Sequence, residues 1–116
     1  MDRFRPEAFL PLTPIAFAIL VALADGERHG YSILQEIESQ SGAALHAGTL
    51  YRALARLLES RLIDEIDAPP AAGTADERRR YYCLTDRGIA VARAETQRLE
   101  AQLAAARSRR LLRVRS

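Results

Sequence analysis

The sequence has no tryptophan, one cysteine, two histidines and no lysine among its 17 basic residues. A single cysteine cannot form an intramolecular disulfide, so we expect a reducing, cytoplasmic location. No glycine-rich phosphate loop or carboxylate cluster is present, and nothing pairs a nucleophile with a base. We therefore expect no enzymatic activity and no cofactor. The apolar run IAFAILVALA (15–24) is too short to span a bilayer, so no membrane association is expected.

Few side chains could bind a metal ion. His29, His46 and Cys83 are the candidates, and their spacing follows no zinc-ligand pattern. We therefore expect no metal site. An inert thiol is the simplest interpretation of Cys83, and a response to oxidation is the alternative.

The N-terminal segment has the outline of a secretory signal peptide, with early arginines, the apolar run at 15–24 and an Ala-Leu-Ala tripeptide before Asp25. Prolines interrupt the approach to that run. Thr13 and Pro14 are instead a good N-cap and first-turn pair for a helix of the folded protein. We therefore expect a helix over about 13–24, buried on more than one side because it is apolar all round.

The charges are unevenly spread along the chain. Residues 1–60 hold five arginines against seven acids, whereas residues 61–116 hold twelve against eight. Arginine suits bidentate phosphate contacts, although GC-rich codon usage would give the same all-arginine composition. With 116 residues the chain is most simply one domain with a modest core, which would profit from a partner that covers more apolar surface.

Two further helices are expected from their periodicity. The segment 31–41 carries an apolar stripe that begins at Tyr31, and Gly42 is suited to the position just past a helix end. The stretch GTLYRALARLLESRLI (48–63) repeats leucines at spacings of four and three, which gives one stripe to bury. Its other side is polar and basic.

Short extended segments are expected on both sides of that third helix. The connection 42–46 is long enough to hold one. Segments 62–67 and 78–84 have strand-like composition and flank a loop rich in proline, glycine and alanine, so they predict a β-hairpin. Three arginines would stand where this loop meets the second strand: Arg78, Arg79 and Arg80.

A long last helix is expected over 86–110, with Thr85 as its cap and Asp86 in an acidic first turn. Its apolar and small residues alternate at spacings of three and four, as in a coiled-coil seam. A long thin helix has no core of its own, so the seam predicts a second copy of the chain. The predicted dimer contacts are Ile89, Ala92, Thr96, Leu99, Leu103 and Ala106 of this helix, with Ile15 and Ile19 of the first helix.

This order of elements is typical of a winged helix-turn-helix. We predict a mainly α fold with a small β-hairpin, divided into a DNA-binding domain with an N-terminal arm at 1–85 and a dimerisation helix with a basic tail at 86–116. The residues predicted to contact DNA are Gly48, Thr49, Tyr51, Arg52 and Arg56 of the reading helix, and Arg78, Arg79 and Arg80 of the wing. A solvated helix face and a strand edge guarded by charge are the alternatives.

Three stretches, HGYSILQEIE, GTLYRALARLLESRLI and RRRYYCLTDRG, resemble the PadR family of bacterial transcriptional regulators, in this order and with suitable gaps. The resemblance covers roughly residues 12–90. It implies a dimeric winged-helix repressor of the compact type, with a single C-terminal dimerisation helix. It also implies that Gly48, Thr49 and Tyr51 form the DNA-reading turn and that Tyr31, which opens the second helix, contacts DNA. Packing is the alternative for Tyr31.

The sequence departs from the family pattern at two places. Arg61 stands where relatives usually have glycine, so we expect either a left-handed residue at some energetic cost or a different turn. His46 and Ala47 stand where relatives often have Ser-Pro, which removes the usual helix cap. The absence of tryptophan excludes a ligand pocket of stacked tryptophans like that of some compact relatives.

The sequence thus predicts a homodimeric, DNA-binding transcriptional regulator, a repressor of a pseudo-palindromic operator. A small-molecule effector, if there is one, would bind between the first and last helices. The alternative is a winged-helix module that binds another protein and not DNA.

Overall fold

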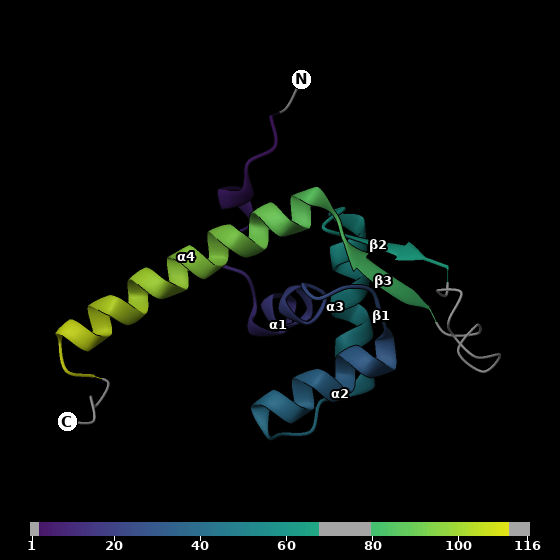
Figure 1. The fold of residues 1–116 in the computed structure, drawn as a ribbon, viewed down its shortest axis with the longest axis horizontal. Helices are drawn as coiled ribbons and strands as arrows, with labels where there is room; N and C mark the ends of the chain where they lie inside the picture. The colour runs from purple at the N-terminus through teal and green to yellow at the C-terminus, as the bar shows by residue number, and fades with distance from the viewer. Residues whose placement is uncertain (1–2, 68–79, 112–116) are drawn as a thin grey trace.

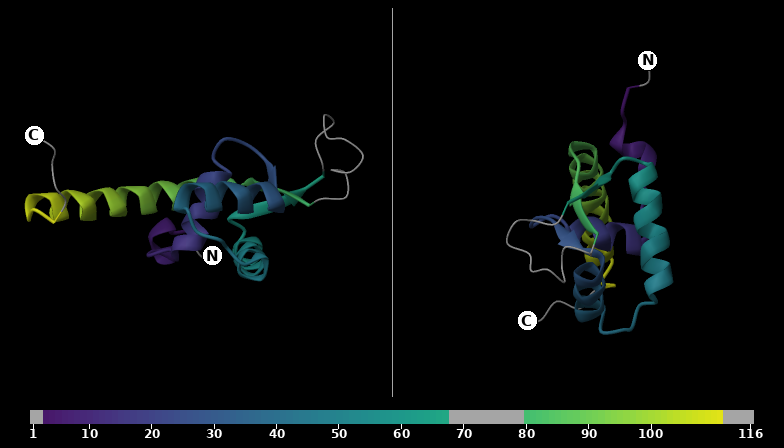
Figure 2. Two further views of the ribbon diagram at one scale, coloured as in Figure 1. Left: turned by 90° about the horizontal axis from the view of Figure 1, so that it is seen from below. Right: turned by 90° about the vertical axis from the view of Figure 1, so that its right-hand side faces the viewer.

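The computed structural model describes residues 3–67 and 80–111. These residues form a mainly helical fold with one small sheet and a long helix whose far end projects from the body (Figures 1 and 2), which confirms the predicted fold class. The elements are, in chain order, η1 (Pro6–Phe9), α1 (Pro14–Ala22), β1 (Arg28–His29), α2 (Gly30–Ser41), α3 (Ala47–Glu59), β2 (Ile63–Ile66), β3 (Tyr81–Leu84) and α4 (Asp86–Ser108). No helix in these ranges is long and apolar enough to cross a membrane.

Side-chain caps fix where three helices begin. The hydroxyl oxygens of Thr13 and Thr85 each accept a hydrogen bond from the amide three residues on, at 3.2 and 3.0 Å. At α2 the cap is His29, whose Nδ1 accepts from the amide of Ser32 at 3.0 Å. Each cap satisfies a first-turn amide that has no partner within the helix. The predicted starts at Thr13 and Thr85 are confirmed, and Gly42 ends α2 with a φ of 72° as expected.

The end of α3 has a left-handed residue at Arg61, which is one of the two alternatives expected where relatives have glycine. Arg61 has a φ of 60°, in the left-handed region that favours glycine. The amide of Leu62 then donates to the carbonyl of Leu57 at 3.0 Å, and the hydroxyl of Thr85 donates to the carbonyl of Arg61 at 2.7 Å. Arg61 thus makes the turn that leads from α3 into β2.

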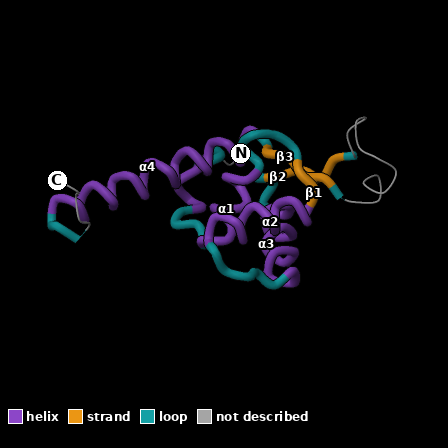
Figure 3. Tube along the Cα trace, turned by 60° about the horizontal axis from the view of Figure 1, so that its bottom comes forward, coloured by secondary structure: helices purple, strands orange, loops and turns teal. Residues whose placement is uncertain are grey.

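The sheet has three antiparallel strands in the order β1-β3-β2, with β3 in the centre. It lies away from the projecting end of α4 (Figure 3). Ile63 of β2 pairs with Leu84, and Arg28 of β1 pairs with Tyr82. Strands β2 and β3 form the predicted hairpin, whose connection at 68–79 lies outside the described residues.

The prediction of an extended piece at 42–46 is wrong. These residues form a loop in which the amide of Leu45 donates to Glu38 Oε2 at 2.8 Å. The third strand lies before α2 instead, where the Arg28 guanidinium pairs with Glu36 at 2.8 Å. Two residues are too few to give an alternating pattern, so periodicity did not mark this strand.

One hydrophobic core joins these elements. Helix α1 contacts α2, α3 and α4, so it links the long last helix to the helix with the basic outer side. The fully buried aliphatic side chains are Ile19, Leu20, Ile33, Leu50, Leu54, Leu62, Ile63 and Val91.

The start of α4 lies directly against the backbone before β2. A Cβ added to Gly88 would lie 2.0 Å from the carbonyl oxygen of Leu62, so only glycine fits there without a shift of the backbone. The amide of Thr85 donates to the same carbonyl at 3.2 Å. This contact fixes the direction in which α4 leaves the sheet.

Candidate functional site

Helix α3 has a buried face and an exposed face. Leu50, Leu54 and Leu57 are buried in the core. The exposed residues of the helix are Ala47, Gly48, Tyr51, Arg52, Ala55, Arg56 and, at its end, Glu59. The name α3 outer face is used here for Gly48, Tyr51, Arg52, Ala55 and Arg56. Thr49 lies half-buried at its edge. The structure therefore brings all five predicted reading-helix residues onto or beside one surface.

Two arginines one helical turn apart give this face its charge. Arg52 Nη2 lies 3.4 Å from the hydroxyl oxygen of Thr49. Within residues 3–67 and 80–111, no carboxylate forms an ion pair with Arg52 or with Arg56. Exposed guanidinium groups without an acidic partner favour the approach of anions.

The first turn of α3 is open to close approach. A Cβ added to Gly48 would meet Arg52 Nη1 at 3.4 Å, which is ordinary contact with a flexible side chain. His46 provides no side-chain cap, so the first amides of α3 are not satisfied by that residue. Amides at a helix N-terminus are suited to bind phosphate oxygens, and the neighbouring Arg52 adds a full positive charge.

Tyr51 leans from α3 toward the start of α2. A Cβ added to Gly30 would lie 2.7 Å from the Tyr51 hydroxyl oxygen, so the phenol ring rests on Gly30. Tyr51 and Tyr31 are nonetheless 48% and 52% exposed. Both phenols can therefore reach a ligand of the α3 outer face. Sequence reasoning missed Gly30, although a glycine directly before Tyr31 was a visible signal.

A groove of about 330 Å³ runs along the other edge of α3. One wall is formed by α3, through Thr49, Arg52 and Arg56, and the other by the segment that leads into α1. The α3 outer face is thus bordered by α2 on one side and by the N-terminal segment on the other.

The wing contributes one described arginine. Arg80 is exposed, and its Nε lies 3.6 Å from Glu65 Oε1 across the hairpin. Burial is the main cause that raises the pKa of the neighbouring Tyr82 phenol, and the carboxylate of Glu65 adds to it. Arg78 and Arg79, the other predicted wing contacts, lie outside the described residues.

The predicted seam of α4 is mostly accessible in the single chain. Ile89, Thr96 and Leu103 are exposed, whereas Ala92, Leu99 and Ala106 are half-buried. On α1, Ile15 is half-buried against the core. Ile19 has no exposed surface, because it packs in the core of its own chain, so the prediction of Ile19 as a direct dimer contact is wrong for this conformation.

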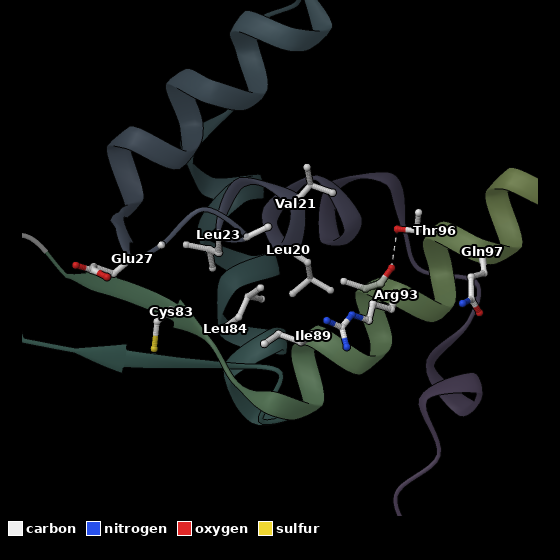
Figure 4. A pocket seen from close by; sticks show the side chains of 13 residues that line it. Leu20, Val21, Leu23, Glu27, Cys83, Leu84, Ile89, Arg93, Thr96 and Gln97 are labelled. Carbon is white, nitrogen blue, oxygen red and sulfur yellow. Dashed lines mark hydrogen bonds between the residues drawn. The ribbon is translucent and has the colours of Figure 1, made fainter.

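A cavity of about 720 Å³ opens between α1, β3 and α4 (Figure 4). Apolar side chains such as Leu20, Leu84 and Ile89 line it, together with Arg93 and Thr96 of α4. The Thr96 hydroxyl donates to a backbone carbonyl of its own helix at 2.8 Å. The cavity lies where an effector pocket was predicted, between the first and last helices.

Cys83 lines the same cavity. Burial, followed by the charge of Asp64, raises the pKa of its thiol, which disfavours the reactive thiolate. Among the described residues, no three His, Cys, Asp or Glu side chains are grouped so that they could hold a metal ion.

Sequence reasoning also missed Glu95, which lies in α4 close to the predicted seam residue Thr96. Its side chain is buried and is bonded to Arg98 and to the backbone of Leu12. A single glutamate in an amphipathic helix carries no sequence signal that distinguishes it from a solvated one.

Comparison with known proteins identifies a family that has this fold. The family model described as "Transcriptional regulator PadR-like family" matches residues 19–94. A solved PadR family transcription regulator from Clostridium difficile is 25% identical, with 83% of this chain and 97% of that chain covered and a TM-score of 0.73. A transcriptional regulator from Clostridium thermocellum is also 25% identical, with 81% and 87% covered and a TM-score of 0.67.

One curated relative is a protein of Streptomyces fradiae described as an uncharacterized 37.1 kDa protein in transposon TN4556. It is 43% identical over 70 residues, which cover 60% of this chain and 18% of that protein. The match thus spans less than a fifth of that relative's length.

Proposed function

Because this chain belongs to the PadR-like family of transcriptional regulators, we propose that it is a homodimer that binds operator DNA and represses transcription. The observation that carries this proposal is the α3 outer face, where Arg52 and Arg56 stand without an acidic partner among the described residues. An ordinary solvated surface has charges of both signs interspersed. Two neighbouring arginines without an acidic partner are therefore better suited to bind a polyanion.

In this proposal the first turn of α3 enters the major groove. Gly48 lets the backbone come close, and Thr49 can bond a phosphate or a base edge. Arg52 reaches phosphate or the O6 and N7 atoms of guanine, and Arg56 contacts the backbone one turn further on. Tyr51 and Tyr31 place hydroxyl groups on phosphates at the edge of the groove.

The wing contacts the adjacent backbone or minor groove through Arg78, Arg79 and Arg80. These arginines contribute electrostatic attraction to phosphates, so the affinity that they add decreases as the salt concentration rises. The division of the chain into a DNA-binding part at 1–85 and a dimerisation part at 86–116 belongs to the same proposal.

The dimer is held together by α4 in this proposal. The projecting half of α4 and the open cavity beside its first half are both available to a partner, and a partner helix that packs along α4 would cover the first and part of the second (Figures 2 and 4). The contacts are the seam residues Ile89, Ala92, Thr96, Leu99, Leu103 and Ala106, with Ile15 of α1. Two reading helices that enter successive major grooves on one face of the DNA lie about 34 Å apart, which matches a pseudo-palindromic operator.

Repression follows from occupancy of the operator, and an effector would act by favouring another spacing of the two reading helices. It can do so only by its difference in affinity between the two arrangements. The part of the 720 Å³ cavity that the partner leaves open is the proposed effector site.

The test is a binding titration with the DNA upstream of the protein's own gene, repeated from about 50 to 200 mM salt, with a scrambled duplex as the control. We expect tighter binding to the upstream DNA and a logarithmic slope of about 0.9 per phosphate neutralised. If a demonstrated dimer binds neither duplex at the lowest salt, the α3 outer face does not serve DNA, and a winged-helix module that binds another protein becomes the better explanation.

A further inference from the structure

Glu95 is the one buried charged side chain among residues 3–67 and 80–111, at 1% exposure. Its Oε1 accepts a hydrogen bond from Arg98 Nε, and its Oε2 accepts from Arg98 Nη2 at 3.1 Å. Oε2 also accepts from the backbone amide of Leu12 at 2.8 Å. The carboxylate therefore joins α4 to a segment 83 residues earlier in the chain.

That segment, residues 3–13, is here named the N-terminal arm. Its 3-10 helix η1 packs along α4. At its beginning the Phe4 ring lies under Arg87, with 4.9 Å between the guanidinium carbon and the ring centroid, and it also contacts the Phe9 ring, 5.7 Å away between centroids. At its end Glu95 holds Leu12. The arm is thus fastened to α4 at both ends.

The end of the arm also borders the proposed reading surface. The 330 Å³ groove beside α3 has the arm and the start of α1 as one wall and α3 as the other. The arm supplies Phe9, Pro11, Leu12 and Thr13, and α3 supplies Thr49, Arg52 and Arg56. Leu12 directly precedes Thr13, the cap of α1, so the bond to Glu95 fixes where α1 begins relative to α4.

We infer that Glu95 is a positioning residue for DNA binding. It holds the end of the arm and the start of α1 against α4, and through the contact of α1 with α3 it sets the position of each reading helix relative to the dimerisation helix. The inference rests on the proposed function, because a fixed spacing of two reading helices matters only to a dimer that binds a two-fold operator.

The carboxylate at this position contributes to the orientation of the arm besides its contribution to stability. Replacing a buried ion pair with well-packed apolar side chains is often neutral or stabilising. An apolar side chain, however, could not accept the Leu12 amide, whereas a carboxylate with two bonded oxygens allows one register of the arm along α4. The carboxylate therefore fixes how the arm is oriented along α4.

The test compares Glu95→Gln with Glu100→Gln, which removes the same charge from an exposed position of the same helix. Glu95→Gln keeps an acceptor for Leu12 but loses the charge that orients Arg98. We expect it to weaken operator binding roughly 2- to 30-fold, with Glu100→Gln unchanged. Circular dichroism and sedimentation first establish a temperature at which all variants are folded dimers.

A second readout separates positioning from stability. A spin label on Ala55→Cys, in a Cys83→Ala background, reports the distance between the two reading helices of a dimer without DNA. We expect one narrow distance distribution in the parent and in Glu100→Gln, and a shifted or broader one in Glu95→Gln. A residue that only stabilises the fold would lower the unfolding temperature and leave this distribution unchanged.

Arg98→Met provides a second variant, since Arg98 is partly exposed and its loss leaves the Leu12 amide bonded. It should shift affinity and distance in the same direction, and it tests the inference if Glu95→Gln does not fold. Parental affinity and parental distances in both variants would overturn the inference. If the parent dimer itself binds no operator, the proposed function fails, while the distance measurement still tests what Glu95 positions.

Discussion

Substitution of Arg52 or Arg56 by alanine tests the proposed reading surface most directly. Each change removes one guanidinium per protomer and therefore two per dimer. If the lost groups contact phosphates, the slope of log affinity against log salt should fall by about 1.8 for either variant. If Arg52 instead contacts guanine, binding should weaken by about 1–3 kcal/mol per site and become less selective at that base.

The same substitutions should leave the fold almost unchanged. Both side chains are exposed, and the only bond to another side chain within the described residues is that of Arg52 to Thr49, at 3.4 Å. Surface changes of this kind alter stability by up to about 0.5 kcal/mol, which corresponds to a shift of at most about 4 °C in the unfolding midpoint. The two substitutions should therefore lower DNA affinity without lowering the stability of the fold.

The assay is fluorescence anisotropy with labelled operator across a salt series, beside thermal unfolding at one fixed protomer concentration. Arg107→Ala is the matched control, because Arg107 is exposed in the last turn of α4, at the end of the helix that projects from the body (Figure 1). The reasoning is refuted if Arg52→Ala and Arg56→Ala keep both the parental slope and the parental affinity. A large loss of stability would show instead that these arginines serve the fold.

Three other predictions follow from α4 and its contacts. Leu99→Asp puts a charge into the seam and should give monomers in sedimentation; intact dimers would exclude this seam. Gly88→Ala should destabilise the protein by about 1–3 kcal/mol in urea unfolding despite the better helix propensity of alanine, whereas Gly48→Ala should cost almost nothing. The Arg98 hydrogen bonds outweigh burial and hold the pKa of Glu95 below its usual range. Its ionisation therefore stabilises the native state above about pH 4, the pKa range of an unfolded glutamate, and the advantage over Glu95→Gln should fade as the pH drops further.

Most helix boundaries were predictable because they depend on local chemistry. A threonine cap needs only its own hydroxyl and the amide three residues on, so Thr13 and Thr85 could be recognised without tertiary structure. Arg61 is a different case, because only the resemblance to the family marked the position as unusual; of the two alternatives it left open, the structure has the left-handed residue. The α3 outer face was predictable from the local sequence, because helical periodicity separates its leucines from its arginines.

The features that could not be predicted depend on contacts between distant segments. Strand β1 exists because Arg28 and His29 meet the central strand, and two residues carry no periodic pattern. An apolar residue such as Ile19 can face its own core or a partner, and the sequence of an all-apolar helix does not distinguish the two. Glu95 is the extreme case, because its partner Leu12 contributes only a backbone amide, which every residue except proline provides.

Helix α1 borders both the proposed effector site and the groove beside the reading helix. Leu20 of α1 and Ile89 of α4 line the 720 Å³ cavity, while Ile15 and Ala16 of α1 line the groove beside α3. A ligand that separates the start of α1 from α4 would stretch the bond between Glu95 and Leu12, and it would displace α3 if α3 moves with α1. To reverse a 99:1 preference between two such arrangements, the ligand must bind one of them about 10⁴-fold more tightly than the other. The bond between Glu95 and Leu12 enters this balance as part of the free-energy difference between the two arrangements, which is the quantity that the ligand must overcome.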